Sequence, residues 1–125
     1  MKPNFTSIGA AAAALGIALG AFGAHALRGK LPETELLIWE TATRYWLVGA
    51  FGLLFFGAFQ AKAELELRPL SPLPGWLLLL GSLLFAASLY ALSLGAPRVL
   101  GAITPLGGLC LIAGFLSFAW AARRR

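Results

Sequence analysis

The stretch FTSIGAAAAALGIALGAFGAHAL, from Phe5 to Leu27, decides the fold class of this chain. It contains no charged side chain except a potential charge on His25, and it exceeds the roughly 20 apolar residues that cross a bilayer core. Ala24-His25-Ala26 has the small-x-small form of a signal-peptide cleavage site. However, the hydrophobic region of a signal peptide spans only about 7–15 residues. We therefore expect a retained transmembrane helix at about 5–27.

The rest of the chain repeats this pattern. Of its 125 residues, 59% are hydrophobic and 12% charged, whereas soluble domains average about 45–50% and about 25%. Long apolar runs predict three further spans at about 41–61, 76–94 and 103–122. The expected fold class is an all-α membrane protein, a four-transmembrane-helix bundle forming a single integral membrane domain over 1–125. The net charge of +5 comes from basic residues at segment ends, so we expect a lipid bilayer as partner and no nucleic acid.

A short amphipathic segment precedes the second span. Apolar residues recur at roughly helical spacing over 33–44, and Glu40 and Arg44 are four residues apart. A helix would place these two on one face as an ion pair. We predict an interfacial helical entry to the second span. Either a separate helix or the first turns of one long helix fits the sequence.

Basic residues predict the orientation. With four spans, Lys2, Lys62, Arg68 and the three terminal arginines share one side, while Arg28, Lys30, Arg44 and Arg98 share the other. The positive-inside rule favours a multi-pass protein of the plasma (inner) membrane with both termini in the cytoplasm. Five aromatic residues lie near the predicted interfaces, as in an aromatic belt: Trp39, Tyr45, Trp46, Trp76 and Trp120.

Small residues within the spans indicate close helix packing. The first span carries a seam at intervals of three or four residues, formed by Gly9, Ala13, Gly16, Gly20 and Ala24. Such residues let transmembrane helices approach closely. The glycines we expect at helix contacts are Gly16, Gly20, Gly23, Gly107 and Gly108. The seams also favour a homo-oligomer or an accessory subunit of a larger membrane complex.

Chemistry-bearing residues are scarce. Aspartate is absent, and the chain has one histidine and one cysteine, Cys110. A metal site needs three or four ligands, so we expect no metal and no cofactor. The candidate polar site comprises His25, Glu40, Arg44, Tyr45 and Thr104. His25 also suits a simple polar helix end. Thr104-Pro105 predicts either a helix start near Pro105 or a kink in a longer helix.

Four ordered blocks carry a family resemblance: LGAFGAHAL (19–27), TATRY (41–45), SLYALSL (88–94) and ITPLGG (103–108). They resemble the small bacterial membrane proteins of domain of unknown function 423, whose animal relatives are called transmembrane protein 256. The resemblance covers nearly the whole chain and implies a four-helix inner-membrane protein, with no established reaction or ligand. This chain departs from the family at Gly49, where members commonly carry a second histidine, and at Trp46, usually Gln.

The sequence supports three functional hypotheses. The first is a non-enzymatic membrane protein that packs as a compact bundle and self-associates or serves as an accessory subunit. The alternative is a small transporter or channel whose polar site lies near one membrane face. An intramembrane enzyme or redox carrier is the least favoured hypothesis, because the residues lack a catalytic or ligand constellation.

Overall fold

A computed structural model describes residues 3–123 as an all-α protein. The elements are α1 (Phe5–His25), α2 (Glu33–Leu65), α3 (Leu73–Ser93), the 3₁₀ helix η1 (Arg98–Ala102) and α4 (Thr104–Arg123). Four of its helical segments are long and apolar enough to cross a membrane, which confirms the predicted fold class. Lys2, Arg124 and Arg125, which entered the orientation count, lie outside the described residues.

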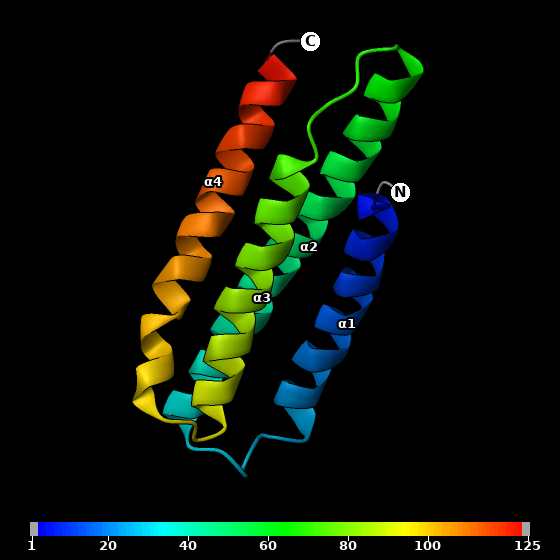
Figure 1. Cartoon of the computed structure of the whole chain (residues 1–125). Coiled ribbons are helices and arrows are strands. Elements are labelled where there is room, and N and C mark those ends of the chain that lie inside the picture. Colours follow the sequence, from blue (N-terminus) through cyan, green and yellow to red (C-terminus); the bar gives the residue numbers. More distant parts are fainter. Residues whose placement is uncertain (1–2, 124–125) are drawn as a thin grey trace.

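The helices form an antiparallel, open arrangement. α1 packs on α2, α2 on α3, and α3 on α4, with α1 and α4 on opposite sides of the molecule (Figure 1). The start of α1, the end of α4 and the α2–α3 connection lie at one end, which we call the terminal end (Figure 1). The α1–α2 connection and η1 lie at the other, which we call the loop end (Figure 1).

α2 is one continuous helix, so the segment over 33–44 forms its first turns. It begins at Glu33 after Pro32 and continues to Leu65. Its 33 residues correspond to about 50 Å at 1.5 Å per residue, against a bilayer core of about 30 Å. The charged first turns and the last turns around Lys62 therefore extend toward the membrane–water boundaries.

Two tryptophans of α2 bind backbone carbonyls of α1. Trp39 Nε1 donates to Leu19 O at 2.9 Å, and Trp46 Nε1 donates to Ala12 O at 2.7 Å. Their side chains are only 5% and 9% exposed, so the prediction that they belong to an aromatic belt is wrong. An indole N–H removed from water needs an acceptor, and both tryptophans find one on the neighbouring helix.

Glycines open these carbonyls to the indoles. Gly23 and Gly16 each follow an accepting carbonyl by four residues, and a helical side chain covers the turn before its own Cα. A Cβ on Gly23 would lie 2.5 Å from the Trp39 ring, and one on Gly16 would lie 2.8 Å from Trp46. Each tryptophan therefore fits because the side chain that would cover its acceptor is absent.

Glycines also allow α3 and α4 to approach closely, although no tryptophan takes part in this contact. A Cβ on Gly81 would approach the Leu111 backbone nitrogen to 2.7 Å, and one on Gly107 would collide with the backbone of Phe85. Gly108 differs, because its nearest neighbours would be ring atoms of Phe85 at 3.7 Å, an ordinary contact. Gly20 is intermediate, 3.4 Å from a methyl group of Thr43.

η1 and α4 are separate elements, so no single kinked helix covers 98–123. Ile103 separates them, and α4 begins at Thr104 with Pro105 in its first turn. Proline is tolerated there because the first helical N–H groups have no intrahelical acceptor. The Thr104 hydroxyl is directed to α3, where it shares a 2.5 Å hydrogen bond with Ser88.

Gly81→Ala should destabilise the protein by about 1–3 kcal/mol, because the added methyl group forces α4 away from α3. Unfolding of the full chain in detergent micelles measures the change. Gly108→Ala is the matched control and should be neutral or slightly stabilising, since alanine favours helix by up to about 1 kcal/mol. Equal effects of the two substitutions would contradict the described α3–α4 contact.

Candidate functional site

A cavity lies between α1 and the beginning of α2, near the loop end. It encloses about 320 Å³ and is lined by Gly20, Gly23, Ala24, Leu36, Trp39, Glu40, Thr43, Arg44 and Leu47. A second cavity of about 350 Å³ shares Glu40 and Leu36 with it and adds Arg28 and Glu33. The small residues of α1 leave this space open, and α2 supplies its charged groups.

Glu40 and Arg44 both line the first cavity, but no ion pair within 4.0 Å joins them in the described part of the chain. The predicted pairing is therefore wrong for this conformation. Both side chains are exposed, and an exposed pair gains little from contact because ordering two long side chains offsets the attraction. Each charged group remains available to water or to a lipid head group.

The other three candidate residues lie elsewhere. His25 is exposed in the last turn of α1 and lines neither cavity. The ring of Tyr45, 40% exposed, packs edge-on against Phe85 with centroids 4.9 Å apart. Successive helical residues differ by about 100° in direction, so Tyr45 faces a different neighbour from Arg44. Thr104, as described above, pairs with Ser88 across the α3–α4 contact. The structure thus brings together only Glu40 and Arg44.

Sequence reasoning missed a polar pair between α2 and α3. The Thr43 and Tyr90 hydroxyls share a 2.5 Å hydrogen bond. The ring of Tyr90 also packs against Trp39 with centroids 4.4 Å apart. The sequence did contain a signal for this pair, because Thr43 and Tyr90 lie in two of the four blocks that carry the family resemblance. These hydroxyls satisfy one another inside the bundle, as buried polar groups generally must.

The described residues offer little for metal or nucleophilic chemistry. Within 3–123 no group of three or more His, Cys, Asp or Glu side chains could hold a metal ion. Cys110, on α4, is a free thiol. The Ser88 hydroxyl hydrogen-bonds Phe85 O as well as Thr104, and Ser82 donates to Leu78 O. Local hydrogen bonding thus occupies these hydroxyl groups.

Tyr90→Phe and Thr43→Val should each destabilise the protein by about 0.5–1.5 kcal/mol, because each leaves one hydroxyl without its partner. The double variant should lose less than the sum of the two. Reversible unfolding in mixed micelles measures all three. Tyr45→Phe is the control with little expected effect, and strict additivity of the pair would argue against the Thr43–Tyr90 bond.

Comparisons with known proteins agree with this architecture. A family profile described as "Protein of unknown function (DUF423)" matches residues 19–108. UPF0382 membrane protein YwdK of Bacillus subtilis is 42% identical over 118 residues, 94% of each chain. A UPF0382 membrane protein of Staphylococcus haemolyticus is 41% identical over 112 residues, 90% of this chain and 88% of the relative. No solved structure matches. Four potential spans and relatives named membrane proteins make the chain an integral membrane protein in contact with lipid, and it belongs to the DUF423 family.

Proposed function

We propose that this protein is a non-enzymatic, single-domain component of the plasma (inner) membrane that self-associates or serves as an accessory subunit. Both termini are placed in the cytoplasm. The count of basic residues in the sequence supports this orientation under the positive-inside rule, with six on the terminal side against four on the other side. The six are Lys2, Lys62, Arg68, Arg123, Arg124 and Arg125, and the four are Arg28, Lys30, Arg44 and Arg98. The side-chain hydrogen bonds within the bundle support a structural role, since they leave few polar groups for catalysis.

The observation that carries the proposal is the outer face of α1. Small residues recur there at intervals of four and three, all of them exposed: Ser7, Ala11, Ala14, Ala18 and Ala21. In lipid, such a face permits close helix approach and van der Waals packing. Because α1 packs extensively only on α2, this face is unoccupied within the monomer.

The glycine seam supports intramolecular packing rather than association. Gly16 faces Trp46 and Leu47 of α2, and Gly20 approaches Thr43. The Gly16-x-x-x-Gly20 motif is therefore filled by the protein's own second helix. Self-association is assigned instead to the alanine-rich face on the other side of α1.

A transporter or channel is the weaker alternative. Such a protein needs polar groups that converge on a pathway, whereas His25, Tyr45 and Thr104 do not line the cavity that Glu40 and Arg44 share. The small cavity between α1 and α2 lies toward the loop end of the bundle, so it offers binding space without a route through the membrane. The structure therefore favours an association function over transport.

Disulfide cross-linking in native membranes tests the proposal. In a Cys110→Ala background, Ala14→Cys should give a cross-linked homodimer on mild oxidation, or a covalent adduct with one partner at fixed stoichiometry. Ala113→Cys, exposed near the middle of α4, is the matched control and should cross-link much less. Cross-linking at Ala113→Cys that equals or exceeds that at Ala14→Cys would reject the α1 face as the contact surface.

A further inference from the structure

The cavity between α1 and the first turns of α2 offers two opposite charges to a ligand. Glu40 and Arg44 both line it, and no ion pair joins either of them to another described residue. The other polar side chains of the lining, Thr43 and Trp39, are already hydrogen-bonded to Tyr90 and to the backbone of α1. The groups left for a ligand in these 320 Å³ are therefore one carboxylate and one guanidinium.

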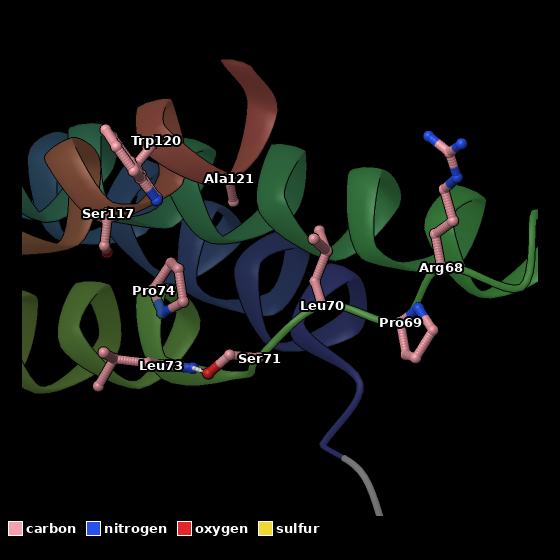
Figure 2. Close-up of a pocket in the computed structure, with 9 residues that line it drawn as sticks. All are labelled: Arg68, Pro69, Leu70, Ser71, Leu73, Pro74, Ser117, Trp120 and Ala121. Carbon is pink, nitrogen blue, oxygen red and sulfur yellow. Dashed lines mark hydrogen bonds between the residues drawn. The ribbon is translucent and has the colours of Figure 1, made fainter. Parts of the chain in front are cut away.

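The larger cavity at the terminal end, of about 480 Å³, presents no such pair. Figure 2 shows it between the α2–α3 connection, the start of α3 and the last turns of α4. Arg68 is its one charged lining residue, and that side chain projects away from the other labelled residues (Figure 2). The terminal cavity therefore defines no charged ligand, whereas Glu40 and Arg44 line one space together.

A neighbouring cavity of about 350 Å³ continues this space toward the loop end. It shares Glu40 with the first cavity and adds Glu33 and Arg28. The charged residues that line the two cavities are thus two acids and two bases. A ligand with a single charge would be attracted by one pair and repelled by the other. The lining therefore favours a ligand that carries both a positive and a negative group.

The two charges of the first cavity have a defined order along α2. A 50 Å helix centred on a 30 Å bilayer core extends about 10 Å beyond the core at each end. Glu40 lies seven residues after the first residue of α2, Glu33, which is about 10 Å along the axis. Glu40 is therefore level with the boundary of the core, and Arg44 lies about 6 Å deeper, toward the centre of the membrane.

Exposed apolar side chains continue the same face of α2 below Arg44. Val48, Phe51 and Phe55 follow it at intervals of four, three and four residues, and all three are exposed. Residues three and four apart lie on one face of a helix. A hydrocarbon chain attached to a ligand at Arg44 would therefore have an apolar surface to follow into the membrane.

We propose that this cavity binds the head group of a phospholipid that carries a primary ammonium, such as phosphatidylethanolamine. In this lipid the phosphate adjoins the glycerol that holds the acyl chains, and the ammonium lies farther out on a two-carbon arm. The protein presents its charges in the complementary order. Arg44 binds the phosphate on the membrane side, Glu40 binds the ammonium on the water side, and the acyl chains lie along Val48, Phe51 and Phe55.

The chemistry of the two charged groups sets the selectivity. A primary ammonium has three hydrogen-bond donors, and charge-assisted bonds to a carboxylate are stronger than neutral ones. The trimethylammonium of phosphatidylcholine has no donor, and phosphatidylglycerol has no cation for Glu40. A soluble head group would gain nothing from the apolar face of α2. A monomer carries the whole site, so lipid binding here goes beyond the proposed association function and does not depend on it.

Native mass spectrometry of the full-length protein in mild detergent tests the site with three lipids of identical acyl chains. Phosphatidylethanolamine should form a one-to-one adduct at a several-fold lower concentration than phosphatidylcholine or phosphatidylglycerol. Glu40→Gln should abolish the preference for phosphatidylethanolamine over phosphatidylcholine. Arg44→Gln should instead weaken the adducts of both zwitterionic lipids by about fivefold, as expected for one cation near a head group. Ala24→Phe, which fills the cavity and retains both charges, should also weaken the phosphatidylethanolamine adduct.

The matched controls are Glu35→Gln and Arg98→Gln, which remove the same charges at the loop end from residues that line neither cavity. Both should leave the lipid preference unchanged, and thermal unfolding of each variant separates loss of binding from loss of fold. Equal binding of the three lipids by the unaltered protein, or equal losses in the controls, would overturn the proposal. Displacement of the phosphatidylethanolamine adduct by millimolar glycerophosphoethanolamine would overturn its lipid origin and indicate a soluble zwitterionic ligand.

Discussion

The bundle depends on the hydrogen bonds from two indoles of α2 to the backbone of α1. Within lipid the hydrophobic effect does not drive helices together, so packing and interhelical hydrogen bonds hold them. Trp39 and Trp46 are seven residues apart, as are the accepting carbonyls of Leu19 and Ala12. Seven residues are nearly two helical turns, so both bonds form on one face of each helix. Together they fix the register of α1, which packs extensively on α2 and little on the other helices.

The same residues connect this contact to the centre of the bundle. Trp39 packs against Tyr90 of α3, and Tyr90 bonds the hydroxyl of Thr43 one turn further along α2. A residue that binds α1 therefore also supports the α2–α3 contact. Because these polar groups are used inside the protein, the surfaces left for function are its outer faces and its two ends. The alanine-rich face of α1 is one such surface.

Much of the fold was predictable, since apolar runs report on membrane-spanning helices almost directly. The sequence does not decide whether the segment over 33–44 is a separate helix or the first turns of α2. Charged residues such as Glu40 suit both an interfacial helix and the start of a long transmembrane helix. The polar site was predicted less well. A correct prediction for Tyr45 and Thr104 requires knowing which face each helix presents to its neighbours, and the sequence alone does not give this. The prediction for Trp39 and Trp46 failed for a related reason. Their hydrogen-bond acceptors are backbone carbonyls that glycines on another helix leave accessible, and composition alone does not reveal such an acceptor.

A double-mutant cycle on Gly23 and Trp39 tests the central claim most directly. The three atoms nearest to a Cβ added at Gly23 all belong to Trp39, so the two positions should be strongly coupled. Gly23→Ala and Trp39→Phe should each destabilise the protein in reversible unfolding. The double variant should be more stable than their sum predicts by at least about 0.5 kcal/mol, because the smaller ring makes room for the methyl group. Strict additivity would contradict the account, since it would mean that Trp39 does not occupy the space that Gly23 leaves open.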